Sequence, residues 1–516
     1  MNGAHAVLRT LVANGVTTCF TNPGTSEMHF VAALDDVPQM RPILALFEGV
    51  VTGAADGYGR MHDRQPAATL LHLGPGLGNG LANLHNARRA RTPIVNIVGD
   101  HATYHQALDA PLASDIVTVA KNVSRWVHES KGPTTVGADV TEAINQARRG
   151  GVATLILPAD ASWSDGAESG PDAAEYAAPG GFDNAVELAA KALRSGEPAA
   201  LLLGGRALRE RGLVAASRIA QATGAKLLCE TFPARLERGA GLPAVERLAY
   251  LAEFAVAQMQ DLRHLVLVDA KEPVSFFAYP NFPSRLAPEG CEIRELVYDS
   301  PSVEDALVAL AEAVGAPADG ALLAAAARPD RPTGVLNAQS IAQAVGAVLP
   351  EGAIVSDEAQ TGGLFVSGAT AGAPRHTWLT LTGGAIGQGM PVATGAAVAC
   401  PDRKVLNLEA DGSAMYTLQS LWTMVRESLD VTTILFNNSS YAVLNMELNR
   451  VGAEAGPRAK AMLDISRPDL DFVALAKGMG VSATRATTAE EFNDQLARSL
   501  ATPGPSLVEA IVPSIV

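Results

Sequence analysis

Short apolar runs rich in Val, Ile and Leu recur along the chain, and each is followed by a turn. After all but the last run, the spacing of apolar residues is typical of a helix. Strands that are apolar at nearly every position are buried on both faces, as in parallel sheets covered by helices. We therefore predict an α/β fold of open, doubly wound, mostly parallel sheets flanked by helices. The runs are Ala67–Leu71, Pro93–Val98, Ala153–Pro158, Ala199–Leu203, His264–Val268, Ile354–Ser356, Val405–Leu408, Val431–Phe436 and Ser506–Ile511.

Two stretches interrupt this pattern. Residues 162–182 are small, acidic and rich in Gly and Pro, and residues 316–332 are rich in Ala and Pro. Both are typical of linkers. A chain of 516 residues is also too long for a single hydrophobic core. We predict three α/β domains, at residues 1–162, 183–315 and 333–516.

Composition and charge limit the possible partners. The net charge of −15, with the charges dispersed, argues against a nucleic-acid partner. The four cysteines are far apart and lack metal-binding or disulfide spacing, which indicates a reducing cytoplasm. Neither a secretory signal pattern nor a membrane-spanning apolar run is visible. We expect a cytoplasmic protein without a membrane partner.

A carboxylate and two amides follow neighbouring strands in the last domain. Asp411 stands among small residues after one strand, and Asn437-Asn438 ends the next. The 24 residues 413–436 leave room for a right-handed crossover that would bring these strand ends together. Such oxygen ligands suit Mg²⁺ bound to a diphosphate, beside a helix that we expect to begin near Met415. Alternatively, Asp411 caps that helix and the asparagines form a turn.

This arrangement resembles the signature of thiamine-diphosphate-dependent enzymes, in which GDG is followed after about two dozen residues by NN. Here Ala410 replaces the first glycine. The resemblance implies that Mg²⁺ is bound by Asp411, Asn438 and the backbone oxygen of Ser440. It also implies that the diphosphate is lined by Gly412, Ser413, Tyr441 and Ala442.

Glu48 is the candidate activating acid. The thiazolium C2 of thiamine is a weak carbon acid, and its activation requires a carboxylic acid beside the pyrimidine in an apolar setting. Glu48 follows the apolar residues 43–47 and precedes a Gly/Ala-rich helix, where family members carry this glutamate. The alternative is a helix-capping role. Upstream, the NPG turn of the family, near the reacting carbons, is matched by Asn22, Pro23, Gly24 and Thr25.

Two further segments match the family. Residues 381–391 resemble the loop that holds the cofactor in its bent shape, with Ile386 between the rings and the Gly384 carbonyl accepting from the 4′-amino group. After the strand at residues 354–356, Gln360 and Thr361 would contact the diphosphate. Either segment could instead be a packing turn.

His72 is the second candidate catalytic residue. The glycine-rich residues 74–80 that follow it could form a dinucleotide-binding loop, but their glycine spacing does not fit one. His72 instead matches an active-site histidine of the benzoylformate decarboxylases, which could relay protons near the reacting carbon. A buried structural histidine is the alternative. The second histidine of those enzymes aligns with Ala278 and is absent.

Over essentially its whole length the chain resembles acetolactate (acetohydroxyacid) synthase large-subunit-like proteins. This implies an N-terminal pyrimidine-binding domain, a central α/β domain and a C-terminal diphosphate- and Mg-binding domain. The family binds its cofactor between the first and third domains across a subunit interface, so we expect at least a homodimer, with a homotetramer typical. We do not expect FAD, because the middle domain is compact and Leu203-Gly204-Gly205-Arg206 is a poor FAD loop. Asp100 also stands where the biosynthetic synthases carry a glutamine.

The expected activity is decarboxylation of a small-molecule 2-oxo acid followed by carboligation, as in acetolactate synthase. Two alternatives remain open within the enzyme class, a simple 2-oxo acid decarboxylase of the benzoylformate type and a 2-hydroxyacyl lyase. An alternative of another class is a non-catalytic paralogue that keeps the cofactor fold.

Overall fold

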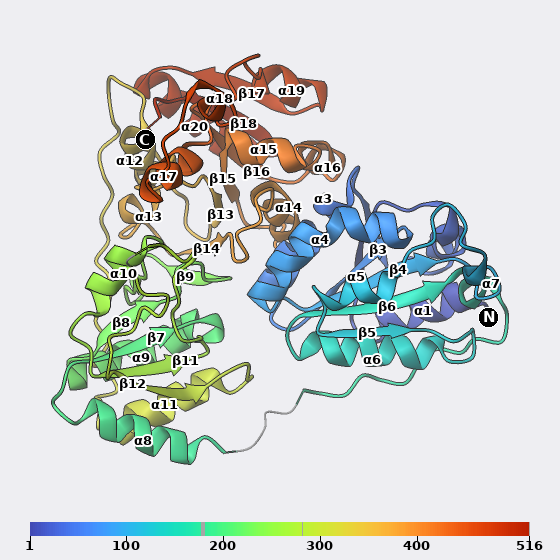
Figure 1. Cartoon of the computed structure of the whole chain (residues 1–516), viewed down its shortest axis with the longest axis horizontal. Helices are drawn as coiled ribbons and strands as arrows, with labels where there is room; N and C mark the ends of the chain where they lie inside the picture. Colours follow the sequence, from blue (N-terminus) through green and yellow to red (C-terminus); the bar gives the residue numbers. More distant parts are fainter. Residues whose placement is uncertain (177–180, 281, 515–516) are drawn as a thin grey trace.

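The computed structural model describes residues 1–176, 181–280 and 282–514. Its strands form three separate sheets, each flanked by helices and, apart from one short strand, each built from a successive part of the chain (Figure 1). All strand pairs in the first two sheets are parallel among the described residues, and the third sheet has one antiparallel pair. The predicted α/β fold of mostly parallel sheets is confirmed. We call each sheet with its helices a unit.

The first unit has a six-stranded sheet in the order β2-β1-β3-β4-β6-β5. The strands are β1 (Thr18–Thr21), β2 (Arg41–Leu44), β3 (Ala67–Leu71), β4 (Ile94–Asp100), β5 (Trp126–Glu129) and β6 (Val152–Pro158). The helices are α1 (Gly3–Ala13), α2 (Met28–Ala33), α3 (Glu48–Met61), α4 (Leu73–Ala90), α5 (Ile116–Lys121), α6 (Val136–Arg148) and α7 (Ala159–Trp163). The central strand β3 is buried at every position, as its apolar run predicts.

The middle unit has a five-stranded sheet in the order β10-β8-β7-β11-β12. Its strands are β7 (Ala199–Leu203), β8 (Lys226–Cys229), β10 (Glu246–Arg247), β11 (His264–Val268) and β12 (Glu292–Val297). Its helices are α8 (Asp183–Leu193), α9 (Glu210–Thr223), α10 (Ala252–Met259) and α11 (Val303–Ala313). β8 and β10 lie on one side of β7, and β11 and β12 lie on the other side. The strand order therefore reverses between β7 and β11.

The third unit has a seven-stranded sheet in the order β17-β18-β16-β15-β13-β14-β9. Its strands are β13 (Ile354–Glu358), β14 (His376–Thr380), β15 (Val405–Ala410), β16 (Val431–Asn437), β17 (Ser482–Ala486) and β18 (Ser506–Ile511), with β9 (Leu236–Arg238) contributed by the middle part of the chain. β9 pairs antiparallel with β14 and extends the edge of this sheet. The helices are α12 (Ala338–Val348), α13 (Val366–Ala369), α14 (Gly389–Ala399), α15 (Asp411–Thr417), α16 (Ser420–Arg426), α17 (Ala442–Arg450), α18 (Pro457–Ala461), α19 (Phe472–Gly478) and α20 (Ala489–Ala501).

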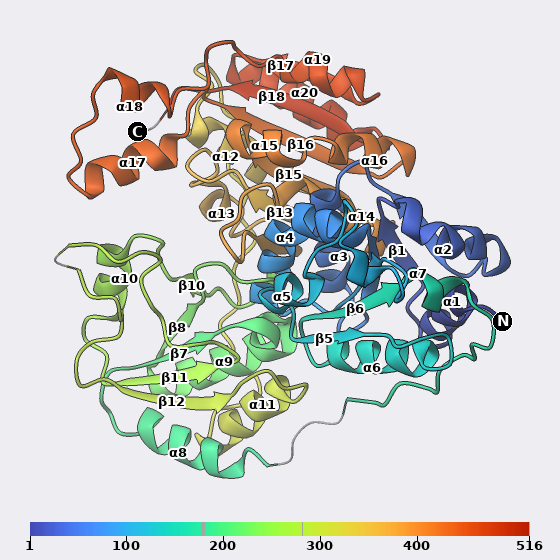
Figure 2. The ribbon, with the colours of Figure 1, turned by 45° about the vertical axis from the view of Figure 1, so that its right-hand side comes forward.

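The first and third units pack together through α3 and α14, which lie against each other (Figure 2). A Cβ atom on Gly57 would lie 2.1 Å from the Val392 carbonyl oxygen, and one on Gly395 would lie 1.8 Å from the Ala54 carbonyl oxygen. Only residues without side chains allow two helix backbones to approach this closely. One apolar core runs through both units along this contact.

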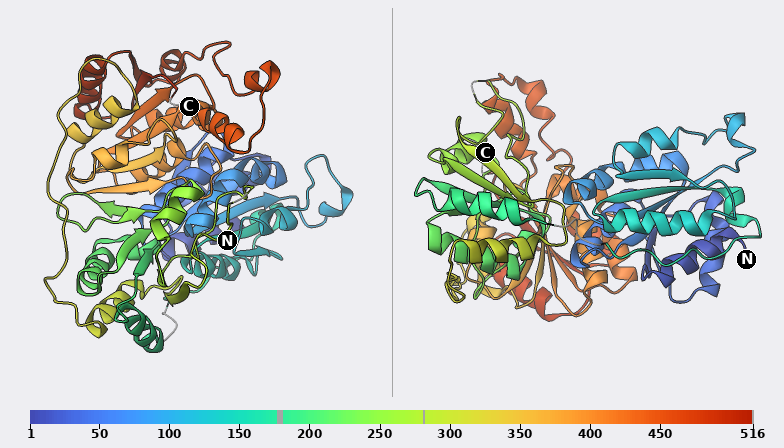
Figure 3. Two further views of the ribbon diagram at one scale, coloured as in Figure 1. Left: turned by 60° about the vertical axis from the view of Figure 1, so that its left-hand side comes forward. Right: turned by 90° about the horizontal axis from the view of Figure 1, so that it is seen from below.

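The connections between units run along the outside. Residues 316–332, expected to be a linker, form neither helix nor strand, and the chain between α11 and α12 follows the surface (Figure 3). In the other expected linker, α7 ends at Trp163 and residues 164–176 are irregular apart from one bridge, while residues 177–180 lie outside the described residues. Among the described residues, no helix has the length and hydrophobicity required to span a bilayer.

Candidate active site

Asp411 lies where two parallel strands end. β15 and β16 are neighbours in the third sheet, so the residues that follow them are adjacent. The Oδ2 atom of Asp411 accepts hydrogen bonds from the backbone N–H groups of Asn438 (2.9 Å) and Ser439 (2.6 Å). Its Oδ1 atom accepts from the Gly412 N–H at 2.8 Å. The structure thus places the two predicted motifs side by side.

The helix after β15 begins at Asp411 itself, and our expectation of a start near Met415 is wrong. Ala410 is extended, and the small residues Gly412 and Ser413 continue directly into the helical turn. Burial raises the pKa of the Asp411 carboxyl, although the backbone N–H groups partly oppose this shift. Because burial disfavours the charged form of Asp411, a bound cation would stabilise its carboxylate.

The two adjacent asparagines point to different partners. Asn437 donates a hydrogen bond from Nδ2 to Glu509 at 2.8 Å, within the sheet. Asn438 accepts the Ser440 N–H at 3.0 Å, on the side of Asp411. A carboxylate, an amide oxygen and a backbone carbonyl are oxygen donors of the kind that Mg²⁺ prefers. No group of three His, Cys, Asp or Glu side chains gathers elsewhere in the described part of the chain as a competing metal site.

Tyr441 covers the turn at Gly412. A Cβ atom on Gly412 would lie 2.5 Å from Cε1 of Tyr441, so the ring packs directly on the glycine backbone. Ala442 begins α17, next to this ring. The surroundings of Asp411 therefore combine small, buried residues with the ring of Tyr441 packed on the backbone.

The glycine-rich segment 381–387 is held from beneath by a buried acid. Glu358 accepts hydrogen bonds from the N–H groups of Gly387 (2.8 Å) and Gly389 (2.5 Å). Burial raises its pKa to about 7 and raises the pKa of the neighbouring Glu409 as well. Both carboxyl groups are buried, and repulsion from Glu358 adds to the shift of the Glu409 pKa. Ser413 donates to Glu409 at 2.7 Å, so this pair connects the segment to the helix of Asp411.

The outer positions of this segment are accessible. Gly384 is exposed, has a φ of +76°, and lies under the ring of Phe276, whose Cζ atom would be 2.8 Å from an added Cβ. Ile386 is half-buried. Gln360 and Thr361, which follow β13, are also half-buried, and Gln360 has a φ of +50°. These four predicted positions are open to a ligand.

Glu48 begins α3 and is 8% exposed. Its Oε2 atom accepts a hydrogen bond from Nδ2 of Asn79 at 3.0 Å. Gly76 lies between Glu48 and His72, because a Cβ atom there would be 3.3 Å from Oε1 of Glu48 and 3.4 Å from Cβ of His72. The structure therefore brings the two predicted catalytic residues together around one glycine. Asn79 was not predicted, since its role depends on the packing of α4 against α3.

His72 is held by a buried carboxylate. Its Nδ1 atom lies 2.9 Å from Oε2 of Glu27, and Oε2 also accepts the Gly24 N–H at 2.8 Å. Burial raises the pKa of Glu27, and attraction to His72 opposes that shift. The predicted NPG turn lies here, with Asn22, Pro23 and Gly24 half-buried and Thr25 exposed. Glu27 was not predicted as a partner of His72, because no pattern in the sequence links the two residues.

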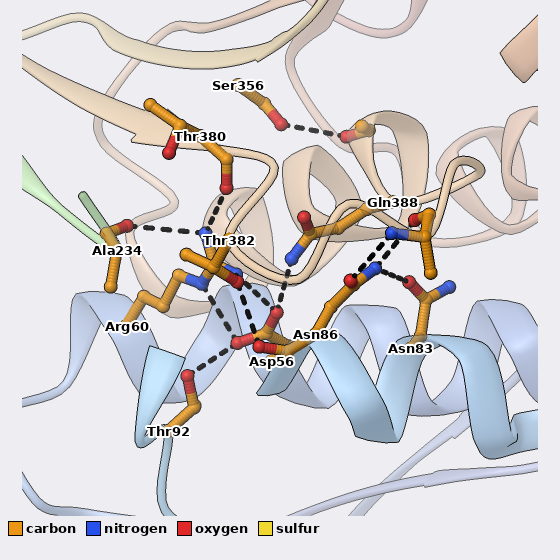
Figure 4. A network of polar contacts seen from close by, with 12 residues as sticks. Asp56, Arg60, Asn83, Asn86, Thr92, Ala234, Ser356, Thr380, Thr382 and Gln388 are labelled. Carbon is orange, nitrogen blue, oxygen red and sulfur yellow. Dashed lines mark hydrogen bonds and ion pairs between the residues drawn. The ribbon is translucent and has the colours of Figure 1, made fainter. Parts of the chain in front are cut away.

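Side chains of α3 and α4 tie the first unit to the segment 381–389 (Figure 4). Asn83 donates from Nδ2 to the carbonyl oxygens of Gly49 (2.8 Å) and Gly387 (3.1 Å). Asn86 donates to the Ala385 carbonyl at 2.7 Å. Arg60 forms an ion pair with Asp56 at 2.6 Å and donates to the carbonyl of Thr380. Asn83 thus connects Gly49, the residue after Glu48, to Gly387 in the predicted cofactor segment.

An aromatic cluster from the middle unit lies over this segment. The ring of Phe276 contacts Phe232, Tyr250 and Phe277 with centroid separations of 5.7, 5.3 and 5.2 Å. The Tyr250 hydroxyl donates to Glu447 of α17 at 3.2 Å. Apolar rings thus lie next to Gly384, at the outer side of the predicted cofactor segment.

The chain matches known proteins over its whole length. Residues 1–120 match the family description "Thiamine pyrophosphate enzyme, N-terminal TPP binding domain", and residues 364–510 match its "C-terminal TPP binding domain". The chain is 60% identical to the "Putative acetolactate synthase large subunit IlvX" of Mycobacterium tuberculosis, with 100% of both chains covered. It is 30% identical to the benzoylformate decarboxylase of Pseudomonas aeruginosa, with 98% of both covered.

Solved structures agree with this assignment. The thiamine diphosphate-dependent 4-hydroxybenzoylformate decarboxylase of Rhodococcus jostii RHA1 is 25% identical and superposes with a TM-score of 0.85, covering 99% of both chains. The benzoylformate decarboxylase of Polynucleobacter necessarius is 23% identical, with a TM-score of 0.82 and coverage of 100% of this chain and 99% of that one, and shows that the fold is shared.

Proposed function

Because this chain belongs to the thiamine pyrophosphate (thiamine diphosphate) enzyme family, we propose that it is a Mg²⁺- and thiamine-diphosphate-dependent enzyme that decarboxylates a 2-oxo acid. The observation that carries the proposal is the position of Glu48, buried at the start of α3 beside His72, in a chain that also presents Asp411 next to Asn438. A chain that used the fold only for binding would have no need of both groups.

The proposed cofactor contacts use both outer units. Mg²⁺ would be bound by Asp411, Asn438 and the backbone oxygen of Ser440. The diphosphate would be lined by Gly412, Ser413, Tyr441, Ala442, Gln360 and Thr361. The rings would lie against Gly384 and Ile386, with the turn Asn22, Pro23, Gly24 and Thr25 near the reacting carbons. When bound, thiamine diphosphate supplies an acidic carbon that becomes a nucleophile and an electron sink.

The protein's own groups then have distinct tasks. Glu48 would hold a proton at the pyrimidine nitrogen, with Asn79 fixing the direction of its carboxyl group. His72, oriented by Glu27, would move a proton to or from the substrate oxygen. The rings around Phe276 would exclude water from the substrate side.

Two outcomes of the decarboxylation are distinguished by their products. Addition to a second carbonyl compound gives a 2-hydroxy ketone acid, and the 60% identity to a protein named as an acetolactate synthase subunit supports this carboligation. Protonation gives an aldehyde, and the aromatic cluster beside Gly384 favours this outcome with an aromatic 2-oxo acid. A 2-hydroxyacyl lyase would use the same groups on a different substrate.

The proposal extends to the assembly. Glu48 belongs to the first unit and Asp411 to the third, and the family arrangement would complete each cofactor site between two subunits. The active form would then be at least a homodimer, with a homotetramer as the typical assembly, in the cytoplasm.

The test is turnover with defined substrates. The protein would be supplied with thiamine diphosphate, Mg²⁺ and either pyruvate or benzoylformate, and carbon dioxide, aldehyde and 2-hydroxy ketone products would be quantified. Glu48→Gln should keep cofactor binding but lower turnover by about 10²–10⁴-fold, the usual contribution of a general acid or base. Glu187→Gln, at an exposed position of α8, is the matched control. Absence of turnover with any 2-oxo acid or 2-hydroxy ketone would favour a non-catalytic paralogue.

A further inference from the structure

A second candidate binding site lies between the first and middle units. A cavity of about 90 Å³ opens beside the ends of β7 and β11, where the middle sheet reverses its strand order. Ligands of open α/β sheets characteristically bind at such a reversal. The cavity is lined mainly by arginines and aspartates, and none of the residues proposed to hold the cofactor is among them.

Positive charge dominates the cavity wall. Six arginines line it, namely Arg60, Arg64, Arg91, Arg206, Arg209 and Arg235. The acidic residues of the wall are three aspartates, Asp63, Asp269 and Asp299. The aspartates are already engaged: Asp269 binds Arg91 at 2.5 Å, Asp299 binds Arg125 at 3.1 Å and Asp63 lies 3.6 Å from Arg206.

Two of the arginines lack an acidic partner. Within the part of the chain that the structure describes, neither Arg64 nor Arg209 forms an ion pair. The guanidinium group of Arg64 donates to the Arg148 carbonyl and lies 4.7 Å from the ring centroid of Tyr176, and that of Arg209 donates to the Arg235 carbonyl. Burial, together with repulsion from Arg235, lowers the pKa of Arg209 to about 9. The cavity therefore contains buried positive charge without a matching negative charge.

Unused donors accompany this charge. The Nε atoms of Arg64, Arg206, Arg209 and Arg235 are buried and have no hydrogen-bond partner among the residues that the structure describes. Buried donors are rarely left in this state unless a ligand, ion or water completes them. Four such atoms around one cavity point to a single missing acceptor with several oxygen atoms.

The size of the cavity limits the ligand. Gly205 follows β7 with a φ of +43°, and a Cβ atom there would lie 2.0 Å from Oδ2 of Asp269, so this carboxylate packs against the backbone at the cavity wall. The cavity has room for several water molecules, which is enough for a phosphate group but too little for a dinucleotide. Arginine is the residue best suited to bind such an oxyanion.

We propose that this arginine cavity binds a phosphate dianion, either inorganic phosphate or the phosphate group of a small metabolite. Arg64 would contact it from the first unit and Arg209 from the middle unit. The bound anion would neutralise the buried guanidinium groups and stabilise the contact between these two units.

The experiment uses the full chain saturated with thiamine diphosphate and Mg²⁺, so that the diphosphate region cannot take up the probe. Inorganic phosphate and glycerol 3-phosphate would be titrated separately by calorimetry at constant ionic strength in chloride. Tighter binding of the first identifies the free ion as the ligand, and tighter binding of the second identifies a phosphorylated metabolite. Both results support the site.

Arg209→Gln and Arg64→Gln should each weaken binding by about tenfold or more, the value of a lost charge-assisted hydrogen bond. The control is Arg211→Gln, two residues along the chain from Arg209, where an exposed side chain pairs with Asp305 at 2.7 Å. In phosphate-free buffer Arg209→Gln should also raise the midpoint of thermal unfolding, because it removes an uncompensated charge. Failure of both probes to bind, or equal weakening by Arg211→Gln, would overturn the proposal.

Discussion

Oε2 of Glu27 lies 2.9 Å from Nδ1 of His72, and the other oxygen of this buried carboxylate has no hydrogen-bond partner in the described part of the structure. The carboxylate therefore directs its charge towards the imidazole. This fixes the ring orientation and leaves Nε2 as the ring nitrogen that can face a substrate.

Replacing Glu27 should affect the reaction through His72. Glu27→Gln keeps the shape of the side chain but removes the charge of the group that holds the His72 ring at 2.9 Å. We expect kcat for the 2-oxo acid to fall by about tenfold to a hundredfold, with a smaller change in KM. The measurement is kcat and KM between pH 5 and 9. An unchanged pH profile, with activity lost only through lower stability, would show that Glu27 has a purely structural role.

The contact between Gly24 and His72 is close enough to test by adding one methyl group. A Cβ atom on Gly24 would lie 2.2 Å from Cγ of His72, so Gly24→Ala must displace the ring. We expect about a tenfold loss of kcat because the proton-transferring group is misplaced. Gly78→Ala is the control, since a Cβ atom there meets nothing within 4 Å. Equal rates for the two variants would contradict the proposed role of His72.

Asp411 should control cofactor affinity through the metal. Asp411→Asn removes the charged oxygen donor, and we expect binding of thiamine diphosphate in the presence of Mg²⁺ to weaken by about a hundredfold. Calorimetric titration measures this directly. Asp402→Asn, at an exposed position before β15, should bind the cofactor normally. Without metal, Asp411→Asn should be at least as stable as the parent, because burial of the carboxylate opposes its ionisation.

His376 predicts a pH dependence of stability that is independent of the reaction. Burial in β14 lowers its pKa from 6.5 to about 4, and within the described residues Nε2 of the ring has no hydrogen-bond partner. Between these values the unfolded chain binds a proton that the folded chain does not, so the free energy of unfolding decreases as the pH falls from 6.5 to 4. The shift corresponds to about 3 kcal/mol.

His376→Gln should flatten this part of the profile, measured as the urea midpoint at each pH. The exposed His29 provides the control, because His29→Gln should leave the slope unchanged. A profile for His376→Gln that is parallel to that of the parent would assign the pH dependence to other groups.

The sequence predicted the fold well where strands are buried on both faces. β3, β7, β11 and β18 have the predicted bounds, since their apolar runs end at clear turns. β9 was missed because three residues carry no recognisable pattern and its partner strand, β14, lies more than a hundred residues further along the chain. The glycine-rich residues after His72 form the first turns of α4.

The site was predicted only as far as motifs and strand ends allow. Glu48, His72, Asp411 and Asn438 could be proposed because each stands directly after or between apolar runs. The residues that orient them could not, because Asn79, Glu27 and Asn83 act through the packing of separate helices. Roles of this kind have no fixed spacing in a sequence.

The close contact of α3 with α14 changes how the Gly/Ala-rich residues after Glu48 should be interpreted. Bulkier side chains at Gly57 or Gly395 would wedge two folding units apart, whatever chemistry the protein performs. The Gly and Ala residues of α3 are therefore explained by the packing of two units, and their presence is not evidence of a reaction.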